Sequence, residues 1–126
     1  MSARVLVVDD DDQLRRALAT SLTRAGFVVT TADDGAPAMQ MSEANRFELV
    51  IVDYNMKTTT GADVVRHYKE RFGAQIFCLV LSGQDDEETR TACLVAGADV
   101  VMLKPASVQE LRRTLSDAVR GLSANA

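Results

Sequence analysis

Five short apolar segments alternate along this chain with segments of helical period, and this alternation restricts the possible folds more than any other feature. The apolar segments are residues 5–8, 27–29, 49–52, 76–81 and 100–103. Each is too short for a helix and rich in β-branched residues. Four of the five run unbroken, which is typical of strands buried on both faces of a sheet. The second continues into Thr30 and Thr31, as expected of an edge strand.

The segments between these strands carry apolar residues at three- and four-residue steps, which predicts helices. The period is clearest over residues 14–25, 64–72 and 111–122, and glycines follow the first two as expected helix ends. Residues 35–45 predict a weaker helix, and the segment after Gln84 is the least amphipathic.

Strand and helix alternate five times, which predicts an α/β fold with a doubly wound parallel sheet and helices on both faces. The length of 126 residues fits one domain over residues 1–126. Within it, residues 122–126 are expected to be a frayed tail or the start of a linker.

Charge and hydropathy exclude several classes of protein. Lys and Arg number 14 against 18 Asp and Glu, and a net charge of −4 without a basic run argues against direct nucleic-acid binding. No apolar run approaches the ~18 residues of a membrane span, and the N-terminus lacks a secretory cleavage region, so we expect a cytoplasmic protein. Cys78 and Cys93 are expected to be free thiols, and His67 is expected on a helix surface.

Charged or hydroxyl side chains follow four of the five predicted strands. They are the run Asp9–Asp12, then Asp53, Ser82 and Lys104. Because the carboxyl ends of parallel strands meet at one edge of an open sheet, we expect these side chains to lie close together. Three neighbouring carboxylates, Asp9, Asp10 and Asp53, repel one another unless a cation lies among them, and their hard oxygen atoms suit Mg²⁺.

This set of groups suits phosphoryl chemistry. A metal ion, the Lys104 ammonium and the Ser82 hydroxyl would stabilise charge on phosphoryl oxygens, with Asp53 as the nucleophile that forms an acyl phosphate. Simpler explanations exist for single residues: Asp11 or Asp12 as the N-cap of the first helix, and the others as turn or strand-exit residues. Because such residues occur at four strand ends, the pattern favours a phosphoryl-transfer site over four unrelated turn or capping residues.

An ordered set of motifs resembles the receiver domain of two-component response regulators. The motifs are Val7-Val8-Asp9-Asp10, Val50-Ile51-Val52-Asp53, Asn55-Met56, Gly61, Leu81-Ser82-Gly83, Ala96-Gly97-Ala98 and Lys104-Pro105. The resemblance spans essentially the whole chain. It implies a flavodoxin-like (βα)5 fold with strand order 2-1-3-4-5 and a cis Lys104–Pro105 bond.

The resemblance also implies a role for each site residue. Asp53 would accept a phosphoryl group from a histidine kinase or histidine phosphotransfer protein. Mg²⁺ would be bound by Asp9, Asp10, Asp53 and the backbone carbonyl of Asn55, while Lys104 and a displaced Ser82 would contact phosphoryl oxygens. The domain would catalyse its own aspartyl phosphorylation and dephosphorylation without being a conventional enzyme. A downstream protein or fused output domain would respond to the face of the fourth helix, fifth strand and fifth helix.

Several positions depart from the family pattern or tune it. Val101 stands where an aromatic switch residue is common, and Lys57 and Thr60 replace a frequent Pro and Asp, which predicts a looser loop after Asp53. Asn55 and Gln84, at positions that tune dephosphorylation in the family, are polar and neutral, so a phosphoaspartate lifetime between the extremes is expected.

Three other functions compete with this one. A pseudo-receiver would be a docking module that is never phosphorylated, but all the acidic and lysine residues are present. A flavodoxin-like cofactor binder would need a phosphate-cradling loop after the first strand, where four aspartates would repel a phosphate. An aspartate-nucleophile phosphatase would need an Asp-x-Asp-x-Thr pattern after the first strand, which is absent.

Overall fold

Strands and helices alternate strictly in the computed structural model, which describes residues 2–124. The strands are β1 (Arg4–Val8), β2 (Val28–Ala32), β3 (Leu49–Asp53), β4 (Phe77–Ser82) and β5 (Val100–Leu103). The helices are α1 (Asp12–Arg24), α2 (Gly35–Gln40), α3 (Gly61–Phe72), α4 (Glu87–Ala96) and α5 (Val108–Ala124). Short 3-10 helices lie at Met41–Glu43 and Gly73–Gln75.

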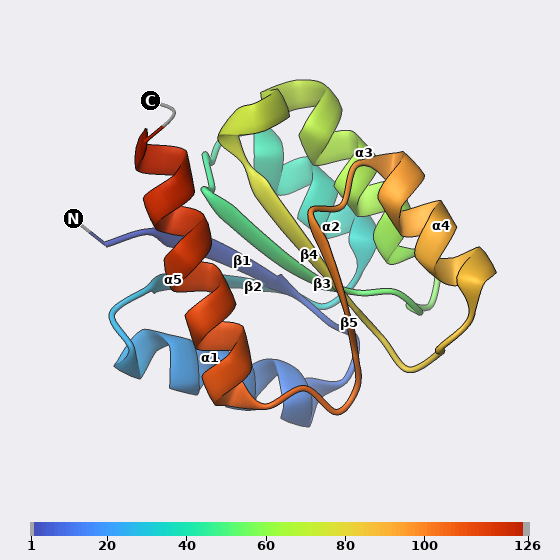
Figure 1. Ribbon diagram of the computed structural model, residues 1–126, viewed down its shortest axis with the longest axis horizontal. Coiled ribbons are helices and arrows are strands. Elements are labelled where there is room, and N and C mark those ends of the chain that lie inside the picture. Colours follow the sequence, from blue (N-terminus) through green and yellow to red (C-terminus); the bar gives the residue numbers. More distant parts are fainter. Residues whose placement is uncertain (1, 125–126) are drawn as a thin grey trace.

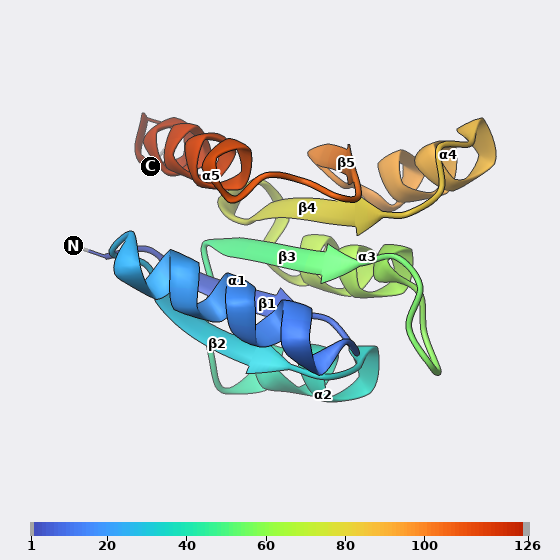
Figure 2. The ribbon, with the colours of Figure 1, turned by 90° about the horizontal axis from the view of Figure 1, so that it is seen from below.

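All neighbouring strands pair in parallel, in the order β2-β1-β3-β4-β5. Helices α1 and α5 cover one face of this sheet, and α2, α3 and α4 cover the other (Figures 1 and 2). The predicted doubly wound α/β fold, flavodoxin-like (βα)5 with strand order 2-1-3-4-5, is therefore confirmed.

Each face of the sheet has its own apolar cluster, and the central strands contribute alternate residues to both. In β1, Val5 and Val7 pack on the side of α1 and α5, while Leu6 and Val8 pack on the side of α2, α3 and α4. This double burial explains why the central strands read as unbroken apolar runs.

Two strands differ from their sequence predictions. Strand β2 lies at an edge as expected, but it covers Val28–Ala32 and not residues 27–29. Strand β5 occupies the other edge, and its residues are half-buried or exposed, so the expectation of burial on both faces is wrong there. An edge strand has only one strand beside it, which leaves Leu103 47% exposed.

Two helix ends also differ. Helix α2 stops at Gln40 and tightens into the 3-10 turn, and the Asn45 side chain donates to the Met41 carbonyl at 3.1 Å. Helix α5 continues to Ala124, so residues 122–124 of the expected tail are helical, because Leu122 extends the apolar stripe packed on the sheet. Residues 125–126 of that tail lie outside the described residues.

The remaining expectations concern the cysteines and membrane spans. Cys78 and Cys93 are free and buried, as predicted. Among residues 2–124, no helix combines the length and apolarity needed to span a bilayer.

Two glycines permit a matched test of backbone energetics. Gly26, after α1, has a φ of 100°, while Gly121 lies inside α5, and a Cβ at either position would meet no atom within 4 Å. We expect Gly26→Ala to lower the free energy of unfolding by about 1 kcal/mol, because the left-handed region is costly for alanine. Gly121→Ala should raise it by roughly 0.5–1 kcal/mol through helix propensity. Urea denaturation measures both, and shifts of the same sign would contradict this account.

Candidate functional site

Three carboxylates gather at the carboxyl-end edge of the sheet. Asp9 follows β1, Asp10 comes next in the chain, and Asp53 is the last residue of β3. One oxygen from each lies within 4.8 Å of the others. Asp9 and Asp53 are only 2% and 7% exposed, and Asp10 is half-buried. Like charges this close and this buried destabilise one another.

Lys104 brings a positive charge into this cluster. It follows β5, and its Nζ lies 2.7 Å from Asp53 Oδ1 and 3.7 Å from Asp9 Oδ2. Its backbone amide donates to the Ser82 carbonyl at 2.8 Å, which holds the chain beside the end of β4 as the side chain reaches the carboxylates. The Lys104–Pro105 bond is cis, as expected.

The ionisation of this pair follows from burial and charge. Burial raises the pKa of Asp53, the contact with Lys104 opposes that rise, and the charges of Asp9 and Asp10 add to it. For Lys104, burial disfavours the charged form, but the contacts with Asp53 and Asp9 outweigh it and raise its pKa. Lys104 therefore stays charged, and a single ammonium faces three carboxylates.

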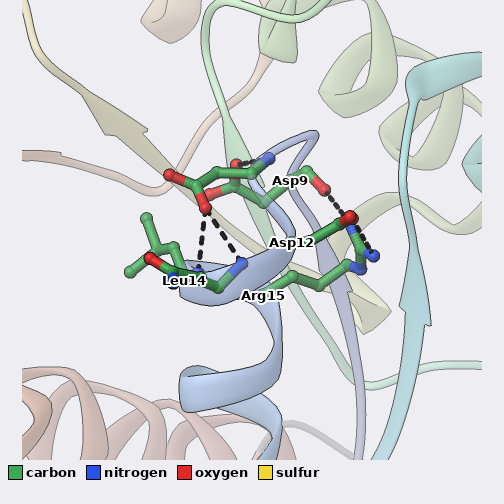
Figure 3. Close-up of polar contacts among 6 residues, drawn as sticks. Asp9, Asp12, Leu14 and Arg15 are labelled. Atoms are coloured by element: carbon green, nitrogen blue, oxygen red, sulfur yellow. Dashed lines mark hydrogen bonds and ion pairs between the residues drawn. The ribbon is translucent and has the colours of Figure 1, made fainter.

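The consecutive aspartates after β1 have separate roles, and Figure 3 shows Asp9 and Asp12 beside Arg15. The Asp9 carboxylate belongs to the cluster, and its Oδ1 also accepts a hydrogen bond from the Asp11 amide at 2.9 Å. The Asp11 side chain caps α1 by accepting from the amides of Gln13 and Leu14, as one of the simpler explanations predicted. Arg15 binds the Asp9 carbonyl at 2.8 Å and the Asp12 carboxylate at 2.5 Å, which fixes the start of the helix against the site.

Ser82 lies at the end of β4, fully buried, but its hydroxyl is bound to its own loop. It donates to the Gln84 carbonyl at 3.2 Å and accepts from the Gln84 amide at 3.1 Å. The sequence placed Ser82 at the correct strand end, and the structure adds this local engagement.

A second polar group, which sequence reasoning missed, extends from this loop into α4. The buried Thr89 hydroxyl lies 3.3 Å from Gln84 Oε1 and 3.0 Å from Asp86 Oδ2. Asp86 is the N-cap of α4 and accepts from the Thr89 amide at 2.7 Å. The three-residue spacing from Asp86 to Thr89 is typical of such a cap, but no local pattern indicates the contact with Gln84.

The loop after β3, residues 54–60, is closed at its base. The Tyr54 amide donates to the Leu81 carbonyl at 2.8 Å, and the Tyr54 carbonyl accepts from the Gly61 amide at 2.8 Å. Asn55 also pairs with Thr60 in an antiparallel bridge. A Cβ on Gly61 would lie 2.8 Å from the Asp53 carbonyl oxygen, so only glycine fits there. Thr60 also forms a capping box with Asp63 at the start of α3. These contacts hold the base of the loop, and the looser loop expected from Lys57 and Thr60 stays a prediction.

His67 lies away from this site and differs from its prediction. It is half-buried, its Nε2 lies 2.8 Å from the Oγ of the buried Ser42, and its ring meets Tyr68 edge-on. The expectation of a helix-surface histidine is wrong because α2 and its 3-10 extension pack over this side of α3.

A comparison with sequence families gives a match over most of the chain. The model of the response regulator receiver domain matches residues 5–116. The chain belongs to this family.

Relatives of this receiver domain include two proteins named response regulator MprA, from Mycobacterium ulcerans and from Mycobacterium tuberculosis strain H37Rv. Each is 38% identical over 111 residues, which cover 88% of this chain and 47% or 48% of the relative. The chain thus spans about half the length of these relatives.

Solved structures give the same fold. The receiver domain from Methanospirillum hungatei matches over the whole of both chains with a TM-score of 0.95 at 20% identity. The chemotaxis response regulator CheY4 of Vibrio cholerae matches with a TM-score of 0.83 at 30% identity, covering 94% of this chain and 99% of that one.

The crowding of carboxylates predicts that the site destabilises the domain. In metal-free buffer near pH 7, Asp53→Asn removes one of the three carboxylates and should raise the free energy of unfolding by on the order of 1 kcal/mol. Because the pKa of Asp53 is raised in the folded state, the parent loses stability as the pH rises through that pKa. The advantage of the variant should therefore shrink as the pH falls.

Urea denaturation at several pH values measures this difference. Asp85→Asn, which removes an exposed carboxylate before α4, is the matched control and should have little effect. An Asp53→Asn protein less stable than the parent at neutral pH would show that the contact with Lys104 outweighs the repulsion.

Proposed function

We propose that this receiver domain is a phosphorylation-dependent signalling switch in which Asp53 accepts the phosphoryl group in a Mg²⁺-dependent step. The donor is a phosphohistidine on a histidine kinase or a histidine phosphotransfer protein. The observation that carries the proposal is the contact of buried Asp53 with Lys104. A carboxylate oxygen of Asp53 also lies within 4.8 Å of one oxygen each of Asp9 and Asp10. These are the groups that phosphoryl transfer to a carboxylate requires.

The donor set fits a magnesium ion. Asp9, Asp10 and Asp53 would hold it together with the backbone carbonyl of Asn55, and hard oxygen ligands are those Mg²⁺ prefers. Three carboxylates against one ammonium leave a charge of −2 when all are ionised, which a divalent cation neutralises. When bound, the ion supplies positive charge beside the transferring phosphoryl oxygens.

The transfer itself needs one carboxylate oxygen and one mobile cation from this chain. An Asp53 oxygen attacks phosphorus, a P–O bond forms as the P–N bond of the phosphohistidine breaks, and the electron pair of that bond returns to the imidazole. The Lys104 ammonium, 2.7 Å from Asp53 in the described state, then pairs with a phosphoryl oxygen. Attack of water on the phosphorus breaks its bond to the Asp53 oxygen, releases inorganic phosphate and restores the carboxylate, so the domain would remove its own modification.

The contacts of Ser82 suggest how the new charge is transmitted. A phosphoryl group adds roughly −1.5 to −2 charge and strong acceptors, which draw the Ser82 hydroxyl away from Gln84. Gln84 also contacts Thr89 in the first turn of α4, so this exchange of partners reaches the helix. Val101 is half-buried on β5 and has no aromatic ring that could change position on phosphorylation. The change at Asp53 would therefore reach α4 from Ser82 through Gln84.

The surface beyond α4 has the character of an output face. Exposed apolar side chains lie on α4, β5 and the start of α5: Leu94 (46%), Val95 (79%), Leu103 (47%) and Val108 (37%). Response regulators pass their signal to output domains or proteins, and we assign that contact here to this face.

Phosphorylation can be tested directly. After incubation with Mg²⁺ and a small-molecule acyl phosphate, intact mass spectrometry should show one added phosphoryl group, absent from Asp53→Asn and from a sample with chelator. Addition to both proteins would place the phosphoryl group elsewhere. No addition to the parent, together with no detectable Mg²⁺ binding, would favour the phosphorylation-independent docking module.

The lifetime of the phosphoryl group provides a second test. The side chain of Asn55 is exposed beside the site, and Gln84 lies in the loop that holds Ser82. Replacing both by leucine should lengthen the phosphoaspartate lifetime several-fold, because apolar side chains there hinder the approach of water. Radiolabel release or mass spectrometry over time measures it, with the exposed Gln40→Leu as control. An unchanged lifetime would refute a role for these two residues.

A further inference from the structure

A single carboxylate ties together two loops at the carboxyl-end edge of the sheet. Asp34, in the turn between β2 and α2, accepts from Thr58 Oγ1 at 2.7 Å on its Oδ2 and from Thr59 Oγ1 at 3.4 Å on its Oδ1. The same Oδ1 caps α2 by accepting from the Gly35 amide at 2.7 Å. Thr58 and Thr59 form the tip of the loop that follows Asp53, so this tip is bound to the start of α2.

Packing supports the same contact independently of the hydrogen bonds. Gly35 is buried against Thr59, and a Cβ on Gly35 would overlap the Thr59 hydroxyl and lie 2.8 Å from the Thr59 Cβ. The missing side chain at position 35 therefore makes room for the loop. The hydrogen bond from Thr58 holds the pKa of Asp34 below its usual range, so Asp34 is an ionised acceptor at neutral pH.

The loop that Asp34 holds carries, at its base, the group that the proposed function uses: the backbone carbonyl of Asn55. Its base is closed by the pairing of Asn55 with Thr60, and its tip is held by Asp34. Met56 packs on the apolar cluster of the sheet, but residues 57–59 contain neither proline nor a buried residue that would restrict the backbone. The contacts with Asp34 thus restrain the tip of the loop, beyond the point where Met56 packs on the core.

We propose that Asp34 is a positioning residue for the metal site, which holds the loop of residues 54–60 through Thr58 and Thr59 so that the Asn55 carbonyl is in place before the ion binds. The inference rests on the proposed function, because it takes that carbonyl as a ligand. Binding that must order a flexible segment is weakened by the entropy lost in ordering it, and a loop ordered beforehand avoids this loss. Removal of the contact should therefore weaken Mg²⁺ binding without touching any ligand.

The test is Mg²⁺ affinity of the 126-residue chain, measured by calorimetric titration with the metal alone. Thr58→Val removes the exposed hydroxyl with little change of shape, and Asp34→Ser keeps an N-cap for α2 but is too short to reach Thr58. Each should weaken Mg²⁺ binding by roughly three- to ten-fold, the range for one lost hydrogen bond. The double variant should bind no more weakly than Asp34→Ser, because both changes remove the same contact.

Thr31→Val, at an exposed position on the edge strand β2, is the matched control and should bind Mg²⁺ as the parent does. Amide hydrogen exchange over residues 56–59 should be faster in Thr58→Val, while its urea midpoint stays close to that of the control. Equal affinities in all variants would overturn the role of Asp34 and leave the proposed function intact. A parent that binds no Mg²⁺ would overturn the metal step of the proposed function and this inference with it.

Discussion

The crowding of three carboxylates around one ammonium is the interaction on which the rest of the site depends. Asp9 and Asp53 are buried, so neither can relieve the repulsion by turning into solvent. The contact with Lys104 compensates only part of it, and the pKa of Asp53 remains raised. Such a cluster favours the binding of positive charge. Any group that changes the charge there also changes the forces on the strand ends that carry these side chains.

The strand order brings these groups together. Strands β1, β3, β4 and β5 are consecutive in the sheet, and they deliver Asp9, Asp53, Ser82 and Lys104 at adjacent ends. The edge strand β2 delivers no group to the cluster itself, but the turn after it supplies Asp34, which holds the neighbouring loop. Three strands thus bring Asp9, Asp53 and Lys104 into contact, β4 ends beside them with Ser82, and the turn after β2 supports the neighbouring loop.

Much of this could be predicted from the sequence. The unbroken apolar runs gave the strands, and one polar residue after each of four runs gave the cluster, because both signals are local. The contacts that were missed join residues distant in sequence or depend on rotamers: Ser82 bound to Gln84, Thr89 reaching the same loop, Asp34 accepting from Thr58, and His67 bound to Ser42. Neither hydrophobic periodicity nor a short motif predicts such contacts, because they form only when the helices and loops pack together. The helical residues up to Ala124 were missed for a different reason. One further apolar residue in the sequence does not tell whether a helix continues or frays.

The two loops beside Asp53, the proposed phosphoacceptor, differ in the contacts that hold them, and this difference would give the proposed switch a direction. The loop after β3 is closed at its base by the pairing of Asn55 with Thr60 and bound at its tip to the cap of α2. The loop after β4 depends on the Ser82 hydroxyl and on contacts with the first turn of α4. A phosphoryl group on Asp53 would compete for that one hydroxyl and for Lys104, and for none of the contacts that hold the first loop. In the proposed switch, charge added at Asp53 would therefore act on α4 and β5, where the exposed apolar residues lie, and leave the side of α2 and α3 unchanged.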